Sequence, residues 1–386
     1  MARVAFSGFE WGVAEFAASG GTFSFSTTTV RPGGSVRSLR TNPTAGGSGW
    51  VRIETFSAPG VPATAYDVAT SWHTVFFRYA LKPTANSDAF FVCYTAGTIK
   101  LILELDTTGV IVVIDSTFAV VATGAVALSA NTWYQLDIKV GTGNPGPWEV
   151  RINTTLEVLS GNHNLLTTNA TRCVCGPAFS AGSALDYFFD DFKLDDAAYP
   201  GEQVTVAKHP NANGSTMQWT AGTAPSNWTT VDEAVPAAAD YVMTTGAGNE
   251  TALFDLEDAA TAPAVSGTIH STLGLVQARE NTAGATTFKL RLRSNVTNSD
   301  NSTLDIGALT VTNGRYVDLD PDTGAAWTTG GIDGAEVGAV EASTVAVRMS
   351  TATLMVNFTA GAGVTRGVPV IGELDGIFDR SVAVVR

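Results

Sequence analysis

The chain is poor in charged residues and in histidine, and each shortage argues against a class of protein. Only 15% of its 386 residues are charged, and they leave a formal net charge of -14 at pH 7. Nucleic-acid binding needs a lysine- and arginine-rich surface that displaces counterions, so we expect no nucleic-acid partner. The histidines are scattered without metal-ligand spacing, which argues against a zinc site; they are His73, His163, His209 and His270.

Cysteine is also scarce, which excludes a disulfide-stapled fold. The three cysteines, Cys93, Cys173 and Cys175, have an odd count and no framework spacing. On one strand, Cys173 and Cys175 would share a face with Cα atoms about 6.5–7 Å apart, the outer limit for a disulfide. We therefore expect buried structural thiols rather than a bridge between these two residues.

Long apolar runs and familiar catalytic motifs are missing as well. No run approaches the roughly 18 apolar residues of a membrane-spanning helix, so we expect no membrane insertion. The segment Met1–Glu10 has no signal-peptide layout, so we expect synthesis in a cytoplasm without a secretory signal. The chain contains no G-x-S-x-G motif, no phosphate-binding loop and no dinucleotide fingerprint.

The chain is rich in the residues of short strands joined by turns. Its 39 glycines and its 45% hydrophobic content suit turns and packed cores. Apolar and polar residues mix at strand spacing between turn signals, without a long helical period. In the first half, the predicted strands include Trp72–Ala80, Phe90–Tyr94, Lys100–Leu105, Val110–Ile114, Asn131–Val140, Trp148–Asn153 and Phe188–Leu194. We therefore predict an all-β fold.

The stretch Asp186–Gly201 divides the chain into two blocks. Its residues from Phe188 to Leu194 predict a strand with one buried face, and Tyr-Pro-Gly at its end predicts the exit from a compact unit. We predict two consecutive β-sandwich (jelly-roll) domains at residues 1–201 and 223–360. Between them we expect a linker at 202–222, and after them a C-terminal arm at 361–386.

The first block carries a series of motifs in a recognisable order. A hairpin around Asp106-Thr-Thr-Gly109 is followed by "L-x-x-N-T-W-Y-x-L-D-I" at Leu128–Ile138. Then come "W-x-V-x-I-N" at Trp148–Asn153 and "D-Y-F-F-D-D-F" at Asp186–Phe192. This order resembles the concanavalin A-like (laminin-G-like) sandwich, and the resemblance covers roughly the first half. It implies a fold and leaves the function open.

The second block carries a different set of motifs. They are "W-x-x-V-D-E", "D-Y-V", "V-x-A-R-x-x-x-A-G" and "D-P-x-T-G-x-A-W-T", and they resemble a β-sandwich module that recurs in tailed-bacteriophage structural proteins. The residues that carry the resemblance are Trp228, Val231, Asp232, Glu233, Tyr241, Arg279, Gly284, Pro321, Thr323, Gly324 and Trp327. Alanines stand at 237–239 where an acidic run is common, and this departure would weaken an ion site.

The resemblance of the second block implies a non-enzymatic virion protein of a tailed bacteriophage. Such a protein would lie on the particle exterior, as a tail fibre, a minor tail component or a capsid decoration. It would be made in the host cytoplasm, and its partners would be other virion proteins and copies of itself. Its roles would be assembly, stabilisation or host-surface contact, through strand edges and arms that pair with neighbours.

A carbohydrate-binding, lectin-like module is the alternative function. The first sandwich would bind glycans, such as those of a host surface, on its concave face or on its loop rim. The stacking candidates are Trp72 on a strand and Trp148 at a loop edge, while the remaining tryptophans fit core packing better.

Acidic clusters raise the question of a calcium cofactor. Asp190, Asp191, Asp195 and Asp196 offer hard oxygen ligands, as laminin-G-like domains sometimes do. Because no calcium-loop spacing is present, we favour the interpretation that they occupy a solvent-facing strand edge and turn. Asp320, Asp322 and Asp333 are likewise expected to be turn formers first and ion ligands second.

A glycoside hydrolase is the third and weakest hypothesis. The segment Gly372–Asp379 resembles the "G-E-I-D-x-x-E" motif of concanavalin A-like glucanases, where a nucleophile and an acid share one strand. Glu373 and Asp375 would share a face, but Phe378 stands where the acid should be. The segment also lies far outside the first sandwich. We therefore expect no enzyme.

Overall fold

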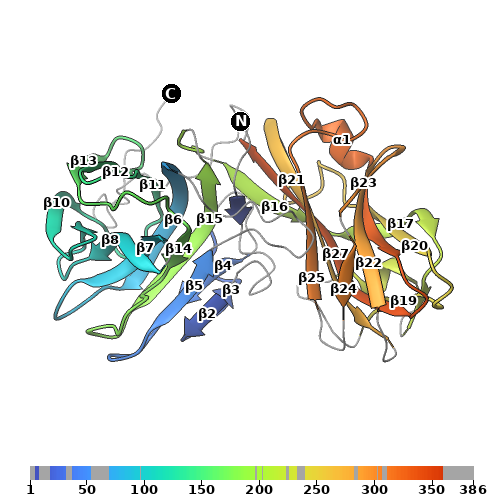
Figure 1. Ribbon diagram of the computed structural model, residues 1–386, viewed down its shortest axis with the longest axis horizontal. Coiled ribbons are helices and arrows are strands. Elements are labelled where there is room, and N and C mark those ends of the chain that lie inside the picture. Colours follow the sequence, from blue (N-terminus) through green and yellow to red (C-terminus); the bar gives the residue numbers. More distant parts are fainter. Residues whose placement is uncertain are drawn as a thin grey trace, which may run out of the picture.

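The protein consists of two β-sandwiches that lie side by side (Figure 1). The prediction of an all-β fold with two consecutive sandwiches is confirmed. The computed structural model describes residues 5–7, 18–31, 37–53, 69–95, 97–195, 198–201, 203–222, 226–232, 240–281, 286–301, 303–306 and 311–359. Within these ranges the regular structure is almost entirely β. The exceptions are a 3-10 turn, η2 (Trp228–Thr230), and a short helix, α1 (Thr329–Asp333).

The first sandwich pairs an eight-stranded sheet, sheet A, with a seven-stranded sheet, sheet B. Sheet A has the order β13-β12-β11-β6-β15-β4-β3, with β1 beside β15. Its strands are β1 (Ala5–Ser7), β3 (Phe23–Ser26), β4 (Ser38–Thr41), β6 (Ser71–Leu81), β11 (Tyr134–Val140), β12 (Gly146–Ile152), β13 (Glu157–His163) and β15 (Asp186–Asp195).

Sheet B has the order β10-β9-β8-β7-β14-β5-β2. Its strands are β2 (Ala18–Gly21), β5 (Gly49–Ile53), β7 (Asp88–Thr95), β8 (Thr98–Leu105), β9 (Val110–Asp115), β10 (Val120–Ala127) and β14 (Arg172–Cys175). Every pairing in both sheets is antiparallel, and the strand order shows several crossovers between the sheets. Such crossovers are typical of a jelly-roll sandwich.

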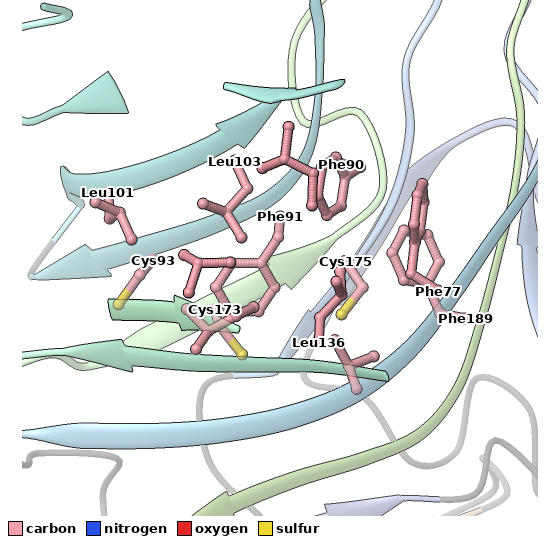
Figure 2. Packing of buried hydrophobic residues seen from close by; sticks show 14 of the residues in the cluster. Phe77, Phe90, Phe91, Cys93, Leu101, Leu103, Leu136, Cys173, Cys175 and Phe189 are labelled. Atoms are coloured by element: carbon pink, nitrogen blue, oxygen red, sulfur yellow. The ribbon is translucent and has the colours of Figure 1, made fainter. Parts of the chain in front are cut away.

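Aromatic rings and thiols fill the space between sheets A and B (Figure 2). Phe77 of β6 stacks on Phe90 of β7, with ring centroids 4.4 Å apart. All three cysteines are buried and none of them is in a disulfide, so the prediction of buried structural thiols is confirmed. Burial raises the pKa of the Cys173 and Cys175 thiols, which keeps them protonated and unreactive.

The second sandwich pairs two six-stranded sheets, sheet C and sheet D. Sheet C contains β16 (Val204–Lys208), β18 (Thr220–Ala221), β19 (Val242–Met243), β21 (Thr268–Glu280), β25 (Val311–Val317) and β27 (Val347–Thr359). Sheet D contains β17 (Pro210–Met217), β20 (Thr251–Leu256), β22 (Thr286–Ser294), β23 (Thr297–Asp300), β24 (Leu304–Ile306) and β26 (Ala335–Glu341). A separate apolar cluster lies between them.

The segment 202–222, predicted as a linker, is part of the second sandwich, and that prediction is corrected. Strand β16 pairs along its whole length with β27, from Val204 opposite Phe358 to Lys208 opposite Leu354. Trp219 is 1% exposed in the same core. The prediction failed because β17 carries Asn, Gly, Ser and Thr in place of alternating apolar residues. The predicted arm, 361–386, lies outside the described residues.

Candidate functional site: the outer face of sheet A

The two-residue alternation of sheet A points one set of side chains into the core and a second set outward. The outward set includes two rows that cross four neighbouring strands, β12, β11, β6 and β15. The first row is Arg151, Asp137, Thr74 and Lys193. The second row is Glu149, Lys139, Trp72 and Asp195. Charged and aromatic side chains from separate parts of the chain are therefore brought together.

Five half-buried residues of this face form a continuous cluster, which we call the outer-face cluster: Trp72, Lys139, Glu149, Arg151 and Tyr199. The rings of Trp72 and Tyr199 meet edge to face, with centroids 4.6 Å apart. The Lys139 ammonium lies 4.6 Å from the Trp72 ring centroid, and the Arg151 guanidinium lies 4.4 Å from that of Tyr199. Arg151 Nε also pairs with the Glu149 carboxylate.

Asp137 lies beneath this cluster as a buried carboxyl. It is 2% exposed and accepts hydrogen bonds from Thr74 Oγ1 at 2.6 Å and from Gln135 Nε2 at 3.0 Å. Burial raises the pKa of Asp137, although these donors and the charges of Arg151 and Lys193 oppose that shift. Asp137 is therefore a fixed part of the sheet surface that holds neighbouring polar side chains in place.

Tyr199 contributes a neutral hydroxyl to the outer-face cluster. Burial raises the pKa of Tyr199, and the nearby Glu149 carboxylate raises it further. The hydroxyl consequently stays protonated and can donate a hydrogen bond. With two rings, a guanidinium, an ammonium and a carboxylate, the cluster offers apolar faces together with donors and acceptors, which suits a small ring ligand that carries hydroxyl groups.

The two predicted stacking tryptophans lie in different surroundings. Trp72 lies in the outer-face cluster, but Trp148 points into the core and is 2% exposed. Trp148 lies opposite Gly161, where an added Cβ would come 3.2 Å from the indole. It shares the core face of β12 with Val150 and Ile152. The expectation that Trp148 stacks on a glycan is therefore corrected.

Two of the acidic residues considered for calcium are buried, in contrast to the solvent-facing strand edge and turn that we expected. Asp190 and Asp191 are 0% and 1% exposed, beside a register shift in β15. Asp191 pairs with Arg31, and Lys193 Nζ lies 4.0 Å from its Oδ1. Asp195 accepts a bond from the Ala198 amide, at 3.2 Å. The side chains of Arg31 and Lys193 thus lie where an ion would have to approach Asp191, and Asp196 lies outside the described ranges.

Across the described ranges, no group of three or more His, Cys, Asp or Glu residues is arranged to hold a metal ion. Asp320 acts as the expected turn former, and Asp322 lies in the same turn, whereas Asp333 ends the helix α1. Asp320 Oδ1 accepts the Asp322 amide at 3.0 Å, and Asp333 Oδ1 accepts the Ala259 amide at 2.6 Å. The two oxygens of Asp322 accept from Asn295 and Thr297.

The motif residues of the second sandwich serve packing and turns. Val231 and Trp327 are buried in its core, and Trp228 packs against it. Pro321, Thr323 and Gly324 form a turn in which Gly324 has a φ of +66°. The remaining described members are Asp232, Arg279 on β21 and Tyr241, whose ring lies 4.3 Å from the Arg348 guanidinium. Glu233 and Gly284, with Glu373 and Asp375 of the hydrolase motif, lie outside the described residues.

Most of the outer-face cluster was not predicted from the sequence, although strand alternation could have predicted part of it. Trp148, Val150 and Ile152 alternate along a predicted strand, so Glu149 and Arg151 between them had to share the opposite face. The same alternation on the preceding strand places Lys139 on the outer face, between Ile138 and Val140 of the core. Tyr199 gave no such signal, because its place depends on how the chain after β15 folds back over the sheet.

Comparisons with known proteins assign neither a family nor a role to this chain. No family model and no curated protein matches the chain. Among solved structures, cellulose-induced protein Cip1 is 15% identical, with a TM-score of 0.39 over 51% of this chain and 100% of that one. The Emp47p carbohydrate recognition domain is 10% identical, with a TM-score of 0.33 over 47% of this chain and 88% of that one.

A third similar structure is the binding domain of Paraclostridial Mosquitocidal Protein 1. It is 12% identical, with a TM-score of 0.32 over 61% of this chain and 59% of that one. Identities this low transfer no residue role. In the described part of this chain, no helix has the length and apolar character needed to span a membrane.

Proposed function

We propose that this protein is a carbohydrate-binding, lectin-like protein that binds glycans at the outer-face cluster of its first sandwich. The observation that supports the proposal is the pair of rings, Trp72 and Tyr199, each with a cation over its face and with Glu149 beside them. Sugar rings present apolar C–H faces to aromatic rings and hydroxyls to charged side chains. Glu149 and Arg151 supply matching acceptors and donors.

Lys139 covers one face of Trp72 and must move for a sugar ring to stack there. Its contact is a cation–π interaction at a half-exposed site, which contributes about 0.5–1 kcal/mol. The lysine stem is flexible, so the ammonium can exchange its contact with the indole for one with a sugar hydroxyl. The cost of opening the tryptophan face is therefore small compared with the interactions gained.

A glycan array followed by titration calorimetry tests the proposal. We expect the full chain to bind a defined set of glycans, and Trp72→Ala and Tyr199→Ala each to weaken binding at least tenfold, about 1.4 kcal/mol. Trp50→Ala is the matched control, because Trp50 is another half-buried tryptophan and packs against a separate apolar cluster on sheet B. Equal affinity of the wild type and both site variants would refute the site.

We propose binding without catalysis. Glycoside hydrolysis uses two carboxyl groups on either side of the bond that is cut. On this face Asp137 is buried and accepts hydrogen bonds from Thr74 and Gln135, and Glu149 is paired with Arg151, so both carboxyls are already engaged within the protein. Turnover of β-glucans that Glu373→Gln abolishes would contradict this proposal and favour the hydrolase.

We further propose that the binding takes place on the exterior of a bacteriophage particle. This setting rests on the resemblance of residues 223–360 to phage structural modules, and host-surface glycans would be the ligands. Light scattering of the full chain and of a chain without residues 361–386 tests the expected self-association. We expect a defined oligomer that truncation converts to monomers; monomers in both cases would contradict a self-assembly role for the arm.

A further inference from the structure

The outer-face cluster is completed by the segment that joins the two sandwiches. Tyr199 does not belong to sheet A, because β15 ends at Asp195 and β16 of the second sandwich begins at Val204. The described part of this connector consists of residues 198–201 and Gln203. One wall of the proposed glycan site is therefore made by the connector between domains.

The connector is held in place by a buried group of charged and polar residues, which we call the junction cluster: Arg31, Asp191, Lys193 and Gln203. Their exposed fractions are 5%, 1%, 0% and 2%. Gln203 Nε2 donates to the Pro200 carbonyl at 2.6 Å, next to Tyr199. The Gln203 carbonyl in turn accepts bonds from Lys193 Nζ and, at 3.3 Å, from Arg31 Nη1.

The junction cluster also contacts the second sandwich. Asp191 Oδ1 accepts the amide of Thr205 at 2.9 Å, and Thr205 belongs to β16. On the other side, Lys193 stands in the same row of sheet A as Thr74 and Asp137, beneath the outer-face cluster. Asp191 has a φ of +45° at the register shift of β15, and this conformation turns its carboxylate toward Arg31 and Thr205.

We infer that the junction cluster positions Tyr199. The affinity of the first sandwich for a glycan then depends on the contact between the first and the second sandwich. The inference rests on the proposed function. Gln203 and Lys193 are positioning residues, because they act on the ligand only through the placement of the connector. By linkage, a glycan that binds Tyr199 stabilises the same contact between the sandwiches.

A double-mutant cycle on the full chain tests this coupling. Gln203→Ala removes the side-chain bond to Pro200 and leaves the backbone carbonyl available to Lys193 and Arg31. We expect this change to weaken glycan binding about fivefold in the wild type and to have no effect in a Tyr199→Ala background. A purely structural role of Gln203 would weaken binding equally in both backgrounds.

A second pair of variants gives a control for the loss of a buried lysine. Lys193→Met breaks the bonds to the connector, whereas Lys100→Met breaks bonds from an equally buried lysine to the carbonyls of Thr168 and Leu166. We expect faster hydrogen exchange at residues 198–205 in ligand-free Lys193→Met and Gln203→Ala, and wild-type exchange there in Lys100→Met.

The two proposals fail in different ways. A wild-type chain that binds no glycan on the array refutes the proposed function, and hydrogen exchange alone then decides whether the junction cluster orders the connector. A chain whose glycan binding depends on Tyr199 but not on Gln203 or Lys193 supports the function and refutes the inference. Unchanged exchange at residues 198–205 in both junction variants also overturns it.

Discussion

At the scale of single residues, burial sets the chemistry of His73. This side chain points into the core of the first sandwich, with its ring centroid 5.2 Å from Phe91 and 5.9 Å from Phe192. Loss of water lowers its pKa to about 3. The folded protein therefore keeps a neutral imidazole at pH values where the unfolded chain binds a proton.

This depressed pKa predicts a loss of stability in acid. The unfolded chain takes up the proton below about pH 6.5, so the contribution is fully present above that pH and falls toward pH 3. Between pH 7.5 and pH 5 we expect His73 to account for about 2 kcal/mol of lost stability. Urea unfolding at both pH values measures it. Between the same pH values, the free energy of unfolding of His73→Leu should fall by about 2 kcal/mol less than that of the wild type. An equal fall in the wild type and the variant would contradict the assignment to His73.

Single residues also show why only part of the site could be predicted from the sequence. Trp72 was found because it opens a strand with a clear pattern. The wrong assignment of Trp148 came from ignoring its position on the same face as Val150 and Ile152. The partner of Asp191 could not be predicted, because Arg31 lies 160 residues away and the sequence gives no register between them.

At the scale of elements, β16 decides where the second sandwich begins. Its residues Val204 and Val206 lie in the core of that sandwich, at 1% and 0% exposure. The sequence predicted the central strands of both sandwiches, where apolar and polar residues alternate. It failed for β16 and β17, since β16 has only five residues and β17 is an edge strand that lacks apolar alternation.

The role of β16 predicts the effect of a charge within it. Val206→Asp places a carboxylate in the core, so we expect the second sandwich to lose about 3 kcal/mol or more of its free energy of unfolding. Asn213→Asp, at an exposed position of β17, is the control and should change it by about 0.5 kcal/mol or less. Urea unfolding measures both variants; equal, small effects would show that β16 is a dispensable linker.

At the scale of the whole molecule, the two sandwiches and their connector form one proposed binding unit. The first provides the strands that carry Trp72, Lys139, Glu149 and Arg151, and the connector to the second provides Tyr199. The net charge of -14 favours solubility and disfavours contact with acidic surfaces. Polyanionic ligands would therefore meet long-range repulsion from the chain as a whole, which neutral glycans would not.

A structure of the full chain with the tightest glycan from the array is the decisive test of the proposed site. We expect a sugar ring against Trp72 and Tyr199, with its hydroxyls bonded to Arg151 and Glu149 and with Lys139 moved off the indole. A glycan bound on sheet B, on the second sandwich or at a loop rim without contact to Trp72 and Tyr199 would contradict it.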